Sequence, residues 1–405
     1  MIENYNIAIV GRHTYCGSGG TAVHPTEIAR VLSKRNKVFF VTTWDHIGGL
    51  DAAGSHNEVI HENDNLTVYV EKARHHGKAL QKIKRAYLIR NNVDLFHIHD
   101  FRLGLLGVIE SKRPIILTVH GYLIETTAKD SLLYWTYLKL MKKSVKRADA
   151  VIAVDKTICN WLEHEIANVT DKLYCIPNGA DINKFSPSLD GSEIREIYGI
   201  SNSDQLIFCA RYFYSKNAVE CTIEAVPMIL KEYPNTKLML AGKGPSEDKL
   251  KNLVRKLDLN KNVIFCGEVT HDNIPKYFAA ADVIVNSFTH ISGVEEFETS
   301  SLLDALETGR PIGTSIATLE ALSIGKPVIT ATVGGVKKEV SDREIGILLP
   351  DKNPKALADA VLHIFNDPKL ARRLGKNARE YIIANRSWDK IVEQISEVYA
   401  RALEK

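Results

Sequence analysis

Two cationic side chains in the second half of the chain have the spacing and setting of an anion site. Residues 206–216 read LIFCARYFYSK, so Arg211 directly follows an apolar run and Lys216 lies five residues further on. Such a run is typical of a buried parallel strand, and ligands of parallel sheets bind beyond the carboxyl ends of the strands. Arginine offers a fork of N–H donors and lysine a point charge, so the pair suits a diphosphate. The alternative is a solvated loop that binds no ligand.

A second ligand-binding turn is predicted where the first apolar run ends. Residues 11–25 read GRHTYCGSGGTAVHP, and the glycines Gly17, Gly19 and Gly20 permit a close approach of the backbone to a ligand. The N-terminus of the following helix can hold a phosphate or a sugar hydroxyl. The pattern departs from the dinucleotide fingerprint G-x-G-x-x-G, because Ala22 stands three residues after Gly19. A turn whose glycines are only structural is the alternative.

Three histidines stand at or near the ends of apolar runs. His120 ends the run ILTVH, where a parallel sheet would expose its side chain to a ligand. A packed histidine that is bonded to the backbone is the alternative for His120. His97 and His99 alternate along the run LFHIH and share one face of it. We expect no metal site, because no second cluster of ligand residues pairs with these two histidines.

Residues 293–329 contain the same sequence pattern twice. Residues 303–306 read LDAL and lead through Gly309 to RPI, and residues 319–322 read LEAL and lead through Gly325 to KPV. Each copy therefore combines an acidic helix, a glycine turn and the start of a strand. The longer run KPVITAT follows only the second copy. We therefore interpret the first copy as an inserted segment.

The elements that must position these residues alternate along the whole chain. Short apolar runs, which are typical of buried parallel strands, are separated by amphipathic stretches that predict helices. The predicted helices include Thr26–Asn36, Leu132–Arg147, Val219–Glu232 and Ser246–Leu257. A turn-rich stretch, FSPSLDGSE, divides the runs into two series. The predicted fold class is α/β, with two Rossmann-like βαβ domains that face each other across a cleft. We place these domains at 1–187 and 188–388, and a C-terminal helix at 389–405 can pack back on the first domain.

The composition excludes several classes of protein. A chain of 405 residues with a net charge of +3 gives no electrostatic reason to expect a nucleic-acid partner. Its six cysteines are scattered without a C-x-x-C pair, which favours reduced thiols over a disulfide framework or a zinc site. The N-terminus lacks the pattern of a signal peptide, and no apolar run approaches the roughly 20 residues that span a bilayer. We expect a cytoplasmic protein.

Two predicted helices carry an excess of basic residues. The stretch Lys72–Arg90 has seven basic residues and no acid, and the stretch YWTYLKLMKKSVKRAD adds five more beside Trp135. Basic amphipathic helices with aromatic residues can lie on anionic membrane surfaces. They predict peripheral contact with the inner face of a membrane, and a merely solvated face is the alternative.

Taken in order, these motifs resemble those of the retaining glycosyltransferases of family 4, which have the two-domain GT-B fold. The resemblance covers nearly the whole chain. The motifs that carry it are GGTAVHPTEIARVL, DLFHIHD, ILTVHG, ADAVIAVD, CIPNGADINKF, ARYFYSK, LAGKGP and ADVIVNS. One departure is Asn217, which stands where the family usually has glycine.

The resemblance implies a hexosyl transfer from a nucleotide-diphosphate sugar, linked to UDP or GDP, to a hydroxyl of a glycan or lipid-linked acceptor. The first domain would bind the acceptor and the second the nucleotide sugar. Arg211 and Lys216 would stabilise the leaving diphosphate, and His120 would lie near the transferred sugar. Neither a metal nor a cofactor is implied. The implied donor contacts are Gly19, Gly20, Gly244, Gly313, Thr314, Ser315 and Glu320.

The family normally has two glutamates eight residues apart, of which the first contacts the donor sugar and the second the ribose. Glu320 matches the second, because its helix leads into the family's next strand, but Ile312 stands where the first belongs. We expect Glu296, from the first copy of the repeat, to supply the missing carboxylate as a catalytic residue. The alternative is a catalytically impaired protein of the same fold that binds a nucleotide sugar.

Overall fold

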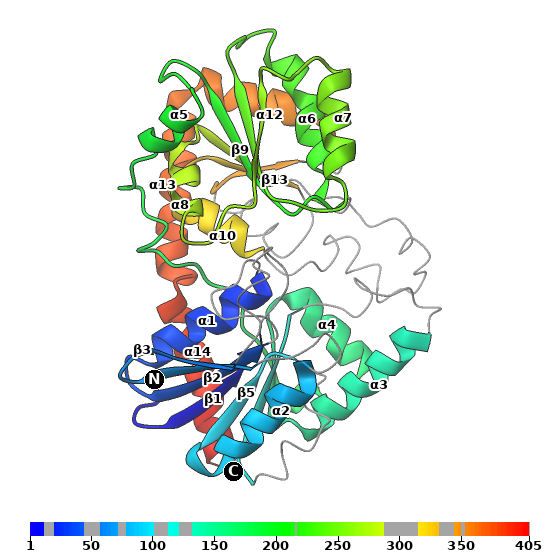
Figure 1. The fold of residues 1–405 in the computed structure, drawn as a ribbon, viewed down its shortest axis with the longest axis vertical. Helices are drawn as coiled ribbons and strands as arrows, with labels where there is room; N and C mark the ends of the chain where they lie inside the picture. Colours follow the sequence, from blue (N-terminus) through cyan, green and yellow to red (C-terminus); the bar gives the residue numbers. More distant parts are fainter. Residues whose placement is uncertain are drawn as a thin grey trace. The chain divides into compact units, whose positions relative to one another are not determined.

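The chain folds into two compact α/β units (Figure 1). The first consists of Met1–Gly179 and Trp388–Lys405, and the second of Ala180–Ser387. The expected division at 187/188 lies further along the chain than the observed one, because Ala180 and Phe185 pack in the core of the second unit. The computed structural model describes residues 1–11, 20–43, 57–71, 78–100, 112–120, 132–214, 217–286, 315–331, 344–349 and 353–404.

The first unit is built on a sheet that has, among the described residues, eight strands in the order β3-β4-β2-β1-β5-β6-β7-β8. The pairs are parallel except for β3 with β4. All residues of the central strands β5, β6 and β7 are buried, as their continuous apolar runs predict. The strands are β1 (Asn6–Val10), β2 (Lys37–Thr43), β3 (Glu58–Asn63), β4 (Leu66–Glu71), β5 (Leu95–Ile98), β6 (Ile115–Val119), β7 (Ala150–Ala153) and β8 (Leu173–Cys175).

The helices of the first unit include one from the far end of the chain. Figure 1 shows this helix, α14, in red beside α1. Helix α1 begins at Gly20, six residues before the expected start at Thr26, so Pro25 lies inside it. Pro25 is the sixth residue of the helix and has no N–H, so the helix lacks the backbone bond to the carbonyl of Thr21. The helices are α1 (Gly20–Leu32), α2 (Lys78–Ile89), α3 (Leu132–Arg147), α4 (Lys156–Glu165) and α14 (Trp388–Leu403), with short 3₁₀ turns η2 (Arg90–Asn92) and η5 (Thr170–Lys172).

The second unit has, within the described part of the chain, a six-stranded parallel sheet in the order β11-β10-β9-β12-β13-β14. The strand order reverses between β9 and β12, and such a switch point is where open α/β sheets bind ligands. The strands are β9 (Leu206–Ala210), β10 (Lys237–Ala241), β11 (Val263–Gly267), β12 (Val283–Asn286), β13 (Val328–Ala331) and β14 (Ile347–Leu349).

Both faces of the second sheet are covered by helices. One core packs α5, α8, α10 and α13 against the sheet, and the other packs α6, α7 and α12. The helices are α5 (Ser192–Ile197), α6 (Val219–Ile229), α7 (Glu247–Lys256), α8 (Ile274–Ala280), α10 (Ile316–Ser323), α12 (Pro354–Asn366) and α13 (Pro368–Asn385). Across the described residues, no helix combines the length and the apolar character that crossing a membrane requires.

Candidate active site

Arg211 lies at the switch point of the second sheet. It directly follows β9, and its backbone N–H donates to the carbonyl of Ala241 at 2.9 Å. The loops after β9 and β10 are packed backbone to backbone, because a Cβ on Gly242 would lie 1.9 Å from the carbonyl oxygen of Arg211. A Cβ on Gly244 would lie 2.7 Å from the carbonyl oxygen of Phe213. Gly244 thus allows the close approach of the loop that carries Arg211.

Helix α10 begins beside this arginine. Arg211 Nη1 donates to Ser315 Oγ at 2.9 Å, and Ser315 is the residue that precedes the first turn of α10. The first amides of a helix have no intrahelical partner and carry partial positive charge. Burial lowers the pKa of Arg211 to about 10. The guanidinium therefore stays charged at neutral pH, so a cation and a helix N-terminus lie together.

Glu320 lies on the same helix, five residues after Ser315, and is buried. Its Oε1 is 2.6 Å from Nε2 of His271, a residue of the loop between β11 and α8. The other ring nitrogen of His271, Nδ1, is 3.1 Å from Nζ of Lys184. Neither His271 nor Lys184 was predicted from the sequence, because a lone histidine or lysine in a polar stretch has no local signature.

In the first unit, four histidines gather at the carboxyl edge of the sheet. His97 lies on β5, His99 and His120 follow β5 and β6, and His24 comes from α1. Neighbouring ring centroids are 4.2–5.4 Å apart. The fold thus brings His24 and His120 to the pair His97 and His99, for which the sequence offered no second cluster of ligands. Adjacent parallel strands end at the same edge, and the spacing along the chain conceals this.

His120 is half-buried, whereas the other three histidines are buried. Its Nε2 lies 2.9 Å from His99 Nδ1, and His24 Nδ1 lies 2.7 Å from Asn178 Oδ1. Burial lowers the pKa of His24 to about 4, and it holds the pKa values of His97 and His99 well below the ordinary range. These three imidazoles are therefore neutral at physiological pH.

The potential metal ligands in this cluster are His24, His99 and His120, whose ligand nitrogens lie within 4.8 Å of one another. Tetrahedral zinc bonds to histidine nitrogens are about 2.0–2.1 Å long, so the three nitrogens would have to close around an ion. The nitrogens of His99 and His120 are at hydrogen-bond distance from each other instead. Both ring nitrogens of His97 have other partners, Tyr399 Oη and Thr118 Oγ1, each at 2.6 Å. The contact with Tyr399, a residue of α14, holds that helix to β5 of the first unit.

The first basic stretch, which includes α2, contains a lysine that is buried in the structure. In α2, Lys82 is buried, donates to the carbonyl of Gly11 at 3.0 Å and lies 3.9 Å from Asp100 Oδ2. Arg85 of the same helix pairs with Glu71. The first stretch therefore does not form a uniform solvated cationic face over its described part, because its periodicity turns Lys82 towards the sheet.

Several predicted site residues lie outside the described residues. They are Gly19, Lys216, Glu296, Gly313 and Thr314. Gly20 is the first residue of α1 and is exposed. Asn217 donates from Nδ2 to the carbonyl of Tyr212 at 2.6 Å.

Comparisons with known proteins cover both units. The family model described as Glycosyl transferases group 1 matches residues 190–381, and the model Glycosyltransferase Family 4 matches residues 18–184. The chain is 24% identical over 400 residues to N-acetyl-alpha-D-glucosaminyl L-malate synthase of Bacillus anthracis, with 96% of each chain covered. It is 27% identical over 323 residues to UDP-Gal:alpha-D-GlcNAc-diphosphoundecaprenol alpha-1,3-galactosyltransferase of Escherichia coli, covering 77% of this chain and 76% of the relative.

A solved structure resembles the chain over almost its whole length. The HepE protein of Anabaena, crystallised with UDP-glucose, aligns with a TM-score of 0.75 at 20% identity, covering 98% of this chain and 100% of that one. This likeness confirms the expected fold class, GT-B.

Proposed function

The chain belongs to the family 4 glycosyltransferases of group 1, and from that premise we propose that it moves a sugar from a nucleotide-diphosphate donor to a hydroxyl of a lipid-linked acceptor with retention. Residues of the second unit support the class of donor, and residues of the first unit support the class of acceptor. The Escherichia coli relative is named for UDP-galactose and a diphosphoundecaprenol-linked acceptor, and the Anabaena structure holds UDP-glucose. These names support a UDP-linked donor, and the resemblance to the family leaves a GDP-linked donor open.

The observation that carries the donor class is the arrangement of Arg211, which follows β9, with Ser315 and Glu320 at the start and in the middle of α10. A cation and a helix N-terminus meet where Arg211 Nη1 bonds Ser315 Oγ. Glu320 follows five residues later, about 7.5 Å along the helix axis. A diphosphate at the start of the helix and ribose hydroxyls at Glu320 would fit this spacing.

The chemistry asked of this site is stabilisation of a leaving group. The bond between the anomeric carbon and the diphosphate oxygen breaks, and negative charge develops on that oxygen. Arg211 is charged before the reaction and is held in place, so it would stabilise that charge without reorganising. Lys216 would add a second cation as the resemblance implies, and the two would do work for which other transferases use a metal.

The transferred sugar would be held by His120 of the first unit and Glu296 of the repeat. His120 would offer a ring nitrogen to the sugar, and its contact with His99 would set its orientation. Glu296 would accept hydrogen bonds from sugar hydroxyls. Both roles are taken from the resemblance to the family.

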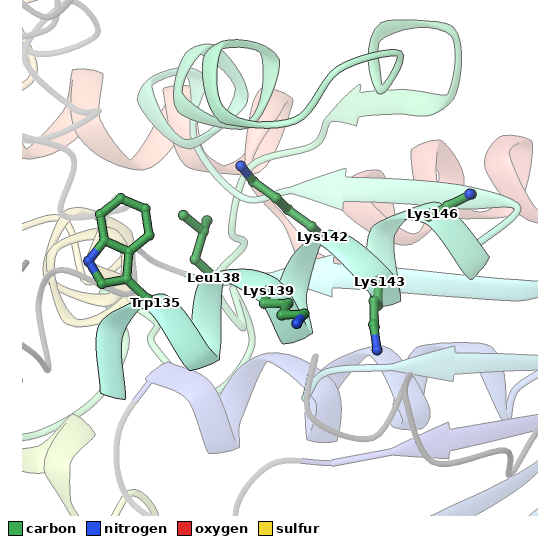
Figure 2. A pocket seen from close by; sticks show the side chains of 6 residues that line it. All are labelled: Trp135, Leu138, Lys139, Lys142, Lys143 and Lys146. Carbon is green, nitrogen blue, oxygen red and sulfur yellow. The ribbon is translucent and has the colours of Figure 1, made fainter. Parts of the chain in front are cut away.

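The acceptor class rests on the exposed face of α3. Trp135 is 59% exposed, and it lines a groove of about 460 Å³ together with Leu138 and four lysines (Figure 2). Between residues 132 and 147 the sequence has five basic residues and no acid. Anionic lipid attracts such a face by about 1 kcal/mol per basic residue, and tryptophan favours the headgroup level. We therefore propose a peripheral contact through α3 that brings the protein to a lipid-linked hydroxyl. The four lysines are Lys139, Lys142, Lys143 and Lys146.

A donor screen tests the proposal. Thermal unfolding would be followed with UDP-, GDP- and ADP-sugars, and donor hydrolysis would be measured by mass spectrometry for any sugar nucleotide that stabilises the protein. Stabilisation with release of the nucleoside diphosphate is the expected result. Binding without any release would indicate the impaired protein that Ile312 suggests, and no binding at all would reject the donor class.

A further inference from the structure

A short chain of hydrogen bonds ends on the carboxylate of Glu320. Lys184 Nζ lies 3.1 Å from His271 Nδ1, and His271 Nε2 lies 2.6 Å from Glu320 Oε1. The side chains of Lys184, His271 and Glu320 are 19%, 16% and 7% exposed. Asp272, which accepts from Lys184 at 2.7 Å, is 85% exposed and lies at the outer end. The three inner groups are therefore largely shielded from water.

The direction of the bonds fixes the tautomer of His271. A lysine ammonium has three donors and no acceptor, so His271 Nδ1 must accept from Lys184. The neutral imidazole then carries its hydrogen on Nε2, which donates to Glu320 Oε1. Hydrogen bonds to ionised partners are short and strong, and both ends of this imidazole meet a charged group.

The backbone at Lys184 is itself anchored to the helix of Glu320. Ser323 Oγ, one turn after Glu320 on α10, donates to the carbonyl of Phe185 at 2.9 Å. Arg379 Nη1 of α13 donates to the same carbonyl at 2.8 Å and to the carbonyl of Ser323 at 3.0 Å. The segment that carries Lys184 and the helix that carries Glu320 are therefore held in one register.

We propose that His271 is a positioning residue for the nucleotide ribose, and that Lys184 fixes the tautomer in which it acts. By binding Oε1, His271 holds Glu320 in one rotamer and leaves Oε2 to accept from the ribose hydroxyls. A flexible glutamate would have to be ordered by the ligand, whereas a held one is ordered before binding. This inference rests on the proposed function, because it assumes that a nucleotide binds along α10.

The test compares ribonucleotides with their dideoxy analogues. Isothermal titration would give the Kd of UDP and GDP, and of the 2′,3′-dideoxy forms, for the wild type, His271→Leu and His271→Gln. We expect His271→Leu to weaken the ribonucleotide about tenfold and to leave the dideoxy nucleotide nearly unchanged. Glutamine can place an N–H near the position of Nε2, so His271→Gln should recover most of the loss. Lys184→Met should change Kd in the same direction as His271→Leu.

The controls separate this role from a structural one. His363→Leu removes an exposed histidine from α12 of the same unit and should change no Kd. An equal loss for ribonucleotide and dideoxy nucleotide in His271→Leu would show a general effect on the site and overturn the inference. So would an unchanged Kd for the ribonucleotide. If the wild type binds neither nucleoside diphosphate, the proposed function fails as well, whereas normal wild-type binding with a silent His271→Leu removes only this inference.

Discussion

Arg211 Nη1 and Ser315 Oγ are 2.9 Å apart although 104 residues separate them in the sequence. This bond ties the end of β9 to the start of α10 and places a guanidinium at a helix N-terminus. Burial leaves the pKa of Arg211 at about 10, still well above neutral pH. The pair therefore forms a permanent cationic site at the switch point of the sheet.

Removing the serine hydroxyl tests whether Arg211 is held by that bond. A hydrogen bond to a charged group contributes about 1.5–3 kcal/mol. Ser315→Ala should therefore lower turnover of the folded protein about tenfold, and it should also lower the melting temperature, because a buried guanidinium loses its acceptor. Ser192→Ala, on α5 of the same unit, is the matched control. Equal turnover in the two variants would show that the bond does not orient Arg211.

The repeat leads to a prediction about the sugar carboxylate. If Glu296 contacts the sugar, Glu296→Gln should lower kcat and leave nucleotide affinity nearly unchanged, because the contact matters mainly as the bond breaks. Ile312→Glu tests the alternative, in which the native site lacks this carboxylate. A silent Glu296→Gln combined with a sharp rise in kcat for Ile312→Glu would show that the first copy is an inert insert.

Buried histidines predict a loss of stability in mild acid. The pKa of His24 falls from an ordinary 6.5 to about 4 in the folded protein, and those of His97 and His99 fall well below 6.5. A depressed pKa means that the unfolded chain binds more protons, so the stabilisation is present above about pH 6.5 and is lost as pH falls towards 4. At about 1.4 kcal/mol per pKa unit, His24 alone accounts for about 3 kcal/mol.

Melting temperatures between pH 7.5 and 4.5 check this prediction. His24→Asn can keep the bond to Asn178 without a titrating ring, so its melting temperature should depend less on pH than that of the wild type. His363→Asn, at an exposed site, should follow the wild type. If His24→Asn has the same pH dependence as the wild type, His24 does not account for the acid sensitivity.

The face of α3 predicts binding to anionic vesicles. The protein should sediment with vesicles that contain phosphatidylglycerol at low salt. At high salt it should stay in the supernatant, because salt screens the attraction between the lysines and the anionic lipid. Replacing Lys139, Lys142, Lys143 and Lys146 by glutamine should abolish retention. The matched control removes four exposed basic residues from α13, namely Lys369, Arg372, Arg373 and Lys376. Equal loss in both variants would point to net charge and not to the α3 face.

Local patterns predicted most of the parallel strands and several helices, because continuous apolar runs and amphipathic periodicity are properties of neighbouring residues. The antiparallel pair of β3 and β4 was missed. Strand β3 reads EVIHEN, which has neither a continuous apolar run nor a regular alternation of apolar and polar residues, and it is mostly exposed. Edge strands of this kind are stabilised by their partner, which the sequence does not identify.

The candidate site was predictable only in part. The resemblance to the family picked out Arg211, Ser315 and Glu320, which the structure brings together on α10 and at the end of β9. It did not indicate His271, whose bond to Glu320 spans 49 residues of sequence. Nor did it foresee that Lys82, in a basic stretch, would be buried beside Asp100. Both arise from tertiary packing that local patterns do not encode.

The central claim is that Arg211 stabilises a nucleoside-diphosphate leaving group at the start of α10. The most direct measurement is the turnover of Arg211→Ala, relative to wild type, with the sugar nucleotide that the screen identifies. Loss of one preorganised donor to a developing anion costs about 2.7–4 kcal/mol, so turnover should fall at least a hundredfold while the protein stays folded. Turnover at the wild-type rate in a folded Arg211→Ala protein would contradict the account.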